Sequence, residues 1–105
     1  MKKLEEKMIN AVNSGRNYKN SNTEVFAFAD GSVFVKLYNT VIFAKVAGQT
    51  FYSDGGWNTV TTASRLRALG ADYSINAKKN NCKLTDYKVI YDLFTDRLFT
   101  AAFGK

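Results

Sequence analysis

The chain contains no histidine and no proline, and it has a single cysteine, Cys82. The absence of histidine removes the commonest general base and the commonest metal ligand. With one cysteine and no visible cluster of carboxylates, neither a zinc site nor a bound cofactor is expected. A lone cysteine also excludes a disulfide within the chain and is typical of a protein in a reducing compartment.

Long apolar runs are also missing. No stretch approaches the roughly 18 to 20 apolar residues that a membrane-spanning helix needs. The first ten residues, "MKKLEEKMIN", lack the apolar core of a signal peptide. We therefore expect a cytoplasmic protein without a membrane partner, and the length suits a single domain over residues 1–105.

Positive charge is present in excess. The chain has 15 Lys and Arg residues against 9 Asp and Glu residues, which gives a formal net charge of +6. Such an excess favours an acidic partner, either a nucleic acid or an acidic protein surface. It is equally typical of a charge that serves solubility.

Residues 1–15 carry apolar side chains at close to the 3.6-residue spacing of a helix. Glutamates near the start and "NSG" near the end are typical boundary signals. We predict an amphipathic helix that covers a sheet. The alternatives are a dimer contact or insertion into a partner's groove. The apolar residues are Leu4, Met8, Ile9 and Val12.

A polar connector over residues 16–22 is expected to lead into an antiparallel meander of about four strands over residues 23–54. Its clearest signal is Asp30-Gly31, a turn pair between two aromatic and β-branched runs. Alternation in the second run predicts two faces. One face holds Val33, Val35 and Leu37, and the other holds Phe34, Lys36 and Tyr38.

Residues 59–70 predict a short helix that needs the sheet to hold it. One of Thr59, Thr61 or Thr62 would cap its start and Gly70 its end. Leu66 and Leu69 would face the core and Arg65 would point away.

Residues 72–103 are predicted as further strands. For residues 87–103 two interpretations compete, because i, i+4 apolar spacing favours a helix while two β-rich runs flank the turn-like "FTDR". We favour the hairpin. The predicted fold class is α+β, a twisted antiparallel sheet of about four to six strands with an N-terminal helix and a short mid-chain helix. The helically spaced residues are Ile90, Phe94, Leu98 and Ala102.

The stretch "SDGGWNTVTTASRLRALG", residues 53–70, admits three interpretations. In the first, the two glycines form a tight turn, Trp57 fills the core and threonines cap the helix. In the second, the helix start and arginines bind an anion, and Tyr38, Tyr52 and Trp57 stack on bases. In the third, Trp, Tyr and Arg form a protein-binding surface. The predicted contact residues are Trp57, Arg65, Arg67, Tyr52, Lys78 and Lys79.

Catalysis without histidine would have to use residues such as Asp54, Asp92, Asp96 or Cys82. No pair of these has a spacing that implies a shared site, and carboxylates beside turns are common in turns of any function. We therefore predict that the protein is not an enzyme.

The segment of residues 37–70 resembles small bacteriophage-encoded proteins that share a GGW-x-T-x-TT-x-SR motif after a Y-x-T-x-I/V-A strand. The resemblance covers about a third of the chain and implies a phage origin, because those proteins have no assigned activity. Ala63 stands where such proteins often carry a basic residue, which argues against a dedicated phosphate site. The matching residues are Tyr38, Thr40, Ile42, Ala44, Gly55, Gly56, Trp57, Thr59, Thr61, Thr62, Ser64, Arg65 and Leu66.

Small phage proteins without a catalytic constellation are often stoichiometric binders. We expect a protein of the host cytoplasm that binds a host protein or nucleoprotein complex and inhibits or redirects it, as an anti-CRISPR or other anti-defence inhibitor does. The alternative is a small basic domain that binds DNA or RNA directly. The sequence leaves the oligomeric state open.

Overall fold

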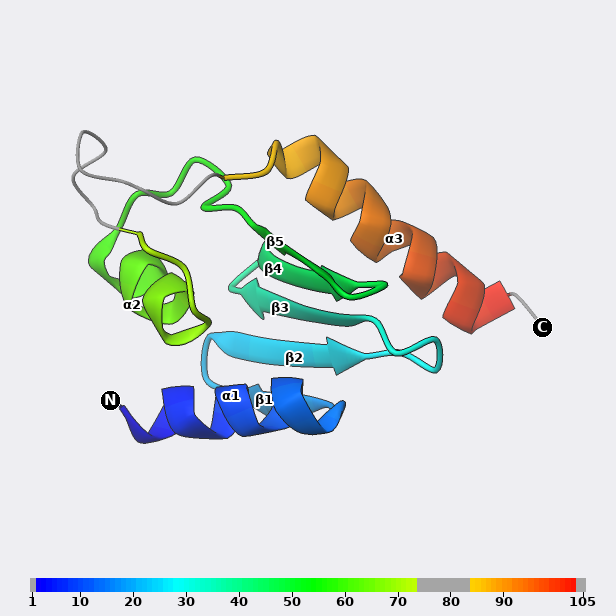
Figure 1. Cartoon of the computed structure of the whole chain (residues 1–105), viewed down its shortest axis with the longest axis horizontal. Coiled ribbons are helices and arrows are strands. Elements are labelled where there is room, and N and C mark those ends of the chain that lie inside the picture. Colours follow the sequence, from blue (N-terminus) through cyan, green and yellow to red (C-terminus); the bar gives the residue numbers. More distant parts are fainter. Residues whose placement is uncertain (1, 74–83, 104–105) are drawn as a thin grey trace.

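The computed structural model describes residues 2–73 and 84–103 (Figure 1). Within these residues, five strands form one antiparallel meander in the order β1-β2-β3-β4-β5. Figure 1 shows helices α1 and α2 on one side of this sheet and α3 on the other. The predicted α+β class is confirmed. The elements are α1 (Lys3–Ser14), β1 (Tyr18–Asn20), β2 (Thr23–Ala27), β3 (Val33–Leu37), β4 (Thr40–Val46), β5 (Gln49–Tyr52), α2 (Val60–Ala68) and α3 (Tyr87–Phe103).

The meander follows the turn signals of the sequence. The β2–β3 turn contains Asp30-Gly31, where the Asp30 Oδ1 atom accepts a hydrogen bond from the Ser32 N–H at 2.9 Å. Gly31 has a φ of 89°, a left-handed value that glycine adopts without steric cost. The predicted hairpin at this turn is confirmed by the pairing of Ala27 with Val33.

Strand β1 was not predicted, because its segment was expected to be a polar connector. Tyr18 pairs with Val25 and Asn20 with Thr23, which adds a short edge strand to the sheet. Lys19 and Asn20 are exposed, and Tyr18 is the residue of this strand that packs against the core. A strand of this kind leaves no hydrophobic alternation to detect.

Both faces of the central strands are buried. In β3, Val33 and Val35 face α1 and α2, while Phe34 faces α3. In β4 the register shifts between the pairs Val35–Phe43 and Lys36–Val41, which is a bulge. Through this bulge Ile42 and Phe43 both reach the α1 and α2 side, whereas Val41 and Ala44 reach the α3 side.

Helices α1 and α2 form the first core with the sheet. Met8 and Ala11 of α1 and Leu66 of α2 are completely buried there. Helix α1 therefore covers the sheet, as predicted. Its end at Gly15, with a φ of 65°, brings the Arg16 N–H to the Ala11 carbonyl oxygen at 2.9 Å.

The predicted hairpin over residues 87–103 is wrong, because these residues form helix α3. Ile90 and Phe94 are 0% and 3% exposed and pack on Phe34 and Val41. The second apolar face of the sheet needs a cover, and helical spacing places both residues over it. Leu98 and Ala102 continue the spacing but are exposed, so the burial ends before the helix does.

Residues 74–83, part of the segment predicted as further strands, lie outside the described residues, as does Cys82. The described residues on either side of them, 72–73 and 84–86, do not form strands, so the prediction is wrong there.

The prediction that Arg65 points away from the core is also wrong. Its guanidinium is buried and lies 2.7 Å from the Glu5 Oε2 atom, with side-chain exposures of 6% and 4%. The Arg65 Nε–H donates to the Thr23 Oγ1 atom at 3.0 Å, and the Ser64 hydroxyl donates to Glu5. This cluster joins α1, α2 and β2. Glu5 lies 60 residues from Arg65 in the chain, so local sequence could not reveal the pair.

The surroundings of Glu5 stabilise its charged form. Burial raises the pKa of Glu5, but the hydrogen bonds from Ser64 and Arg65 and the Arg65 charge outweigh burial and hold the pKa below its ordinary value. Because the folded-state pKa is lowered, the stabilisation is present above the pKa of unfolded Glu5. It is lost as the pH falls through the folded-state value.

Breaking this ion pair should destabilise the fold strongly. Arg65→Met or Glu5→Gln alone should lower the free energy of unfolding by about 3 kcal/mol or more, because each leaves a buried partner uncompensated. The double variant should lose less than the sum of the two, as measured by urea unfolding in a double-mutant cycle. Strictly additive losses would contradict a coupled pair.

The exposed pair Lys88–Asp92 is the matched control, with side-chain exposures of 82% and 60%. A cycle of Lys88→Met and Asp92→Asn should give a coupling below about 0.5 kcal/mol. In addition, the stability difference between the wild type and Glu5→Gln should shrink as the pH falls below about 4.5, because protonated Glu5 resembles glutamine.

Candidate functional site

Two segments that are separate in the sequence meet at one end of the sheet and enclose a cavity of about 370 Å³. The first segment is the turn between β3 and β4. The second runs from the end of β5 to the first turn of α2. We call this cavity the Trp57–Tyr38 pocket. Its lining residues are Leu37, Tyr38, Asn39, Thr40, Ile42, Asp54, Trp57, Thr59 and Thr62.

Tyr38 stands at the edge of the pocket in an unusual backbone conformation. Because Leu37 pairs with Thr40, the β3–β4 turn consists of Tyr38 and Asn39 alone. Tyr38 has a φ of 56°, which is uncommon for a bulky residue, and its side chain is 71% exposed. The turn therefore holds a large aromatic ring out in solvent beside the cavity.

A glycine brings the second segment close to β4. Gly55 has a φ of 61°, and a Cβ atom added there would lie 2.4 Å from the Thr40 Cγ2 atom. Only a residue without a side chain permits this approach. Gly56 also has a positive φ, 86°, but open space surrounds its missing Cβ. The prediction that both glycines form a tight turn is confirmed.

Trp57 follows this turn and is 62% exposed. The interpretation that it fills the core is therefore wrong. The backbone N–H of Trp57 donates a hydrogen bond to the Asp54 carbonyl oxygen at 2.8 Å, which closes the turn. The residue itself stays largely exposed to solvent.

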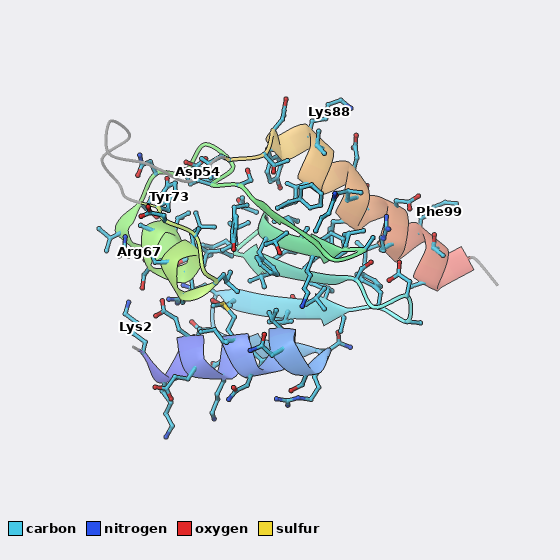
Figure 2. The ribbon with its side chains drawn as sticks, viewed as in Figure 1. Lys2, Asp54, Arg67, Tyr73, Lys88 and Phe99 are labelled. Atoms are coloured by element: carbon cyan, nitrogen blue, oxygen red, sulfur yellow. The ribbon has the colours of Figure 1, made fainter. Side chains whose placement is uncertain are left out.

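Asp54 is held in place from two directions. Its Oδ2 atom accepts a hydrogen bond from the hydroxyl of the buried Tyr73 at 2.7 Å, and its Oδ1 atom accepts one from the Gly56 N–H at 2.9 Å. Figure 2 shows Asp54 and Tyr73 next to each other beside α2. The carboxylate therefore has a fixed position in the wall of the pocket.

The start of α2 completes the wall. The Thr59 Oγ1 atom accepts a hydrogen bond from the Thr62 N–H at 3.1 Å and donates to the Thr62 Oγ1 atom at 3.0 Å. Thr59 is thus the N-cap, one of the three that the sequence allowed. This use of the threonines supports the capping interpretation rather than a site for an anion.

The predicted contact residues do not form one cluster. Trp57 lies at the pocket, but Arg65 is buried in its ion pair with Glu5. Arg67 is exposed on α2 and its Nη1 atom donates to the Tyr73 carbonyl oxygen at 3.2 Å (Figure 2).

Tyr52 is half-buried, and its hydroxyl donates to the Leu69 carbonyl oxygen at 3.0 Å. Lys78 and Lys79 lie outside the described residues. The six predicted contact residues do not include Tyr38 and Asp54, which also line the pocket, although Tyr38 was named for base stacking and Asp54 as a candidate for catalysis. The sequence does contain a signal for Tyr38. It lies with Asn39 between two predicted strands, at a turn position where Gly, Asn or Asp is usual and an aromatic residue is not.

The candidate catalytic carboxylates are also dispersed. Asp92 and Asp96 are exposed on α3, where they form ion pairs with Lys88 at 3.2 Å and Arg97 at 3.3 Å. In the part of the chain that the structure describes, no group of three or more Asp, Glu or Cys residues is placed to hold a metal ion.

None of the helices in residues 2–73 and 84–103 has the length and apolar character required to cross a membrane.

Comparison with known protein families gives a match over almost the whole chain. The family model of the Kyanoviridae Gp96 protein matches residues 1–104. A search of curated proteins and a search of solved structures each gave no match. The family match extends well beyond the third of the chain that carries the motif resemblance, and it confirms the phage origin that the resemblance implied.

The two glycines of the turn should respond differently to substitution. Gly56→Ala should lower the free energy of unfolding by about 1 kcal/mol, because alanine is strained at positive φ. Gly55→Ala should cost roughly 1–3 kcal/mol more, because its Cβ also collides with Thr40. Urea unfolding of both variants measures the difference, and equal losses would show that the close approach of Gly55 to β4 is unimportant.

Proposed function

The chain belongs to the Kyanoviridae Gp96 family of phage proteins, and we propose that it is a non-catalytic protein that binds a host protein or nucleoprotein complex through the Trp57–Tyr38 pocket. It acts in the host cytoplasm and inhibits or redirects the complex that it binds. Inhibition of a host defence complex, of the anti-CRISPR kind, is the proposed outcome of that binding.

The observation that carries this proposal is the exposure of large apolar side chains around a preformed cavity. Tyr38, Trp57 and Val60 are 71%, 62% and 68% exposed, and all three lie in or beside the segments that enclose the pocket. Trp and Tyr are enriched among the residues that dominate binding energy at protein interfaces. Tyr38 and Trp57 line the same cavity, and exposed apolar surface that is gathered in one place usually marks an interaction site.

The pocket is held rigidly, which favours tight binding. Gly55 is packed against Thr40, Asp54 is hydrogen-bonded to Tyr73, and Thr59 caps α2. A surface that is already ordered loses little conformational entropy when a partner binds. The aromatic anchors add to this, because Trp and Tyr have only two side-chain torsions to fix.

The backbone of Tyr38 also supports a functional role for this surface. A left-handed conformation costs an ordinary residue about 1–2 kcal/mol, and asparagine or glycine would avoid that cost. Strained residues concentrate at functional sites, where the strain is part of the design. Tyr38 therefore occupies its turn for what its ring contacts rather than for stability.

One observation favours the nucleic-acid alternative. Tyr38 also borders a groove of about 700 Å³ whose lining includes Lys19 and Lys36, and aromatic rings beside lysines are typical of single-strand binders. However, the Lys36 ammonium lies 5.8 Å from the centres of the Phe26 and Phe94 rings, and Glu24 lines the same groove. A protein target is therefore preferred, and salt dependence separates the two.

Trp57→Ala should abolish capture of the host partner while leaving the fold intact. Removal of an aromatic anchor from an interface typically costs about 2 kcal/mol or more, which corresponds to at least a 30-fold weaker Kd. The measurement is affinity capture from a lysate of the host bacterium with and without nuclease, followed by titration of the purified partner at two salt concentrations.

The matched control is Phe99→Ala, which removes the aromatic side chain of a residue that is 65% exposed on α3. Figure 2 shows Phe99 well away from Asp54, which lines the pocket. This variant should capture the partner as the wild type does. Capture that survives Trp57→Ala would contradict the proposal. Capture that nuclease abolishes, with a Kd that weakens steeply and log-linearly with salt, would favour direct nucleic-acid binding instead.

Tyr38→Asn should stabilise the fold and weaken binding of the host partner. The free energy of unfolding should rise by about 1 kcal/mol because asparagine tolerates positive φ, while the affinity for the host partner should fall tenfold or more. Ala47→Asn is the control, since Ala47 has a φ of 52° in the distant β4–β5 turn. It should raise stability similarly and leave binding unchanged. Equal affinities of the two variants for the host partner would show that Tyr38 is not part of the interface.

A further inference from the structure

The charge of the Trp57–Tyr38 pocket is opposite to that of the whole protein. Among the described residues that line it, Asp54 is the charged one, while the chain carries a net charge of +6. Neither of the two arginines nearest in sequence, both of them in the described part of the chain, forms an ion pair with this carboxylate. Arg65 is paired with Glu5, and Arg67 donates to the Tyr73 carbonyl oxygen. The pocket therefore presents a local negative charge within a mainly apolar wall.

The Asp54 carboxylate has capacity for a further donor. Each oxygen accepts one hydrogen bond, from Tyr73 at 2.7 Å and from the Gly56 N–H at 2.9 Å. An ionised carboxylate offers about four acceptor positions, so about two remain. Because Tyr73 is buried, with 2% exposure, it also fixes the orientation of the carboxylate. A fixed carboxylate with unused acceptor positions suits a planar donor that can bind both oxygens.

The remaining walls match an apolar stem that ends in a cation. The buried side chains of Leu37 and Ile42 line the pocket and suit the methylene groups of a long side chain. The exposed rings of Trp57 and Tyr38 suit a cation, because the face of an aromatic ring attracts positive charge. Arginine combines these features, and its guanidinium binds carboxylates in pairs of hydrogen bonds that lysine cannot form.

An anion fits the same pocket poorly. It would meet the Asp54 carboxylate, and the first turn of α2 already uses the Thr59 hydroxyl to cap the Thr62 N–H. The cavity of about 370 Å³ is at the low end of the roughly 300–1,000 Å³ range for small-molecule sites. A single inserted side chain therefore suits it better than a large cofactor.

We infer that the Trp57–Tyr38 pocket receives an arginine side chain of the partner, with its guanidinium on the Asp54 carboxylate and its stem along the apolar wall. This inference rests on the proposed function, because it names the chemical feature of the partner that the surface recognises. An exposed arginine on the partner, outside its own ion pairs, is the group that the pocket selects.

The test is an NMR titration of the full chain with three blocked amino acids, N-acetyl-arginine, N-acetyl-citrulline and N-acetyl-leucine methylamides. The Trp57 indole N–H and the Thr59 amide report occupancy of the pocket. We expect saturable shifts with arginine and at least tenfold weaker binding of citrulline, which has nearly the same shape without the charge. Leucine should also bind at least tenfold more weakly than arginine.

Asp54→Asn should bring the arginine affinity down to that of citrulline, whereas Asp92→Asn on α3 should leave both affinities unchanged. Equal affinities for arginine and citrulline on the wild type, a preference for leucine, or no saturable shift with arginine would each overturn the inference. The comparison of arginine with citrulline uses the wild-type chain, so it decides the matter even where Asp54→Asn fails to fold.

Failure of this inference is distinguishable from failure of the proposed function. If Trp57→Ala no longer captures the host partner but the wild type binds arginine and citrulline equally, the proposed function is supported and the arginine pocket is contradicted. A clear arginine preference in a protein whose Trp57→Ala variant still captures the partner leaves the pocket standing and removes it from the host interface.

Discussion

The apolar character of both faces of β3 and β4 is the constraint on which the rest of the structure depends. One face of these strands carries Val33 and Val35, and the other carries Phe34 and Val41. A single layer of helices can bury only one of the two faces. The sheet is therefore covered on both sides, by α1 and α2 on the first face and by α3 on the second. Burial of these faces supplies the main driving force for the fold.

Apolar packing alone does not fix where α2 lies along the sheet, and the buried ion pair supplies that position. Arg65 reaches Glu5 on α1 and Thr23 on β2, so α2 is tied to two other elements by directional contacts. Such a cluster is costly if any member is missing, which favours one arrangement over its neighbours. Because the first turn of α2 forms part of the pocket wall, the ion pair also sets the shape of the pocket.

The pocket concentrates features that reduce stability elsewhere in proteins. Tyr38 is held at a positive φ, Gly55 and Gly56 occupy left-handed positions, and Trp57 is exposed to solvent. Each feature is tolerated because rigid elements surround it, and each places a side chain or a backbone segment at the same cavity. The chain is a phage protein of the Kyanoviridae Gp96 family, and positions where a protein departs from the rules of local stability are often functional.

The sequence by itself determined the features that depend on neighbouring residues. The sequence predicted the turn at Asp30-Gly31, the amphipathic pattern of α1 and a threonine cap at the start of α2, because each of these acts within a few positions. It left three threonines open as the cap, and the structure identifies Thr59. Only the tertiary structure decided that residues 87–103 form a helix. The spacing of their apolar residues fits a helix and a strand alike, and the helix is the structure that buries Ile90 and Phe94 on the second face of the sheet. The tertiary structure likewise buried Arg65 beside a glutamate 60 residues away and brought the Tyr38 turn to the Trp57 loop. Contacts between distant residues depend on the packed sheet, and no local pattern encodes them.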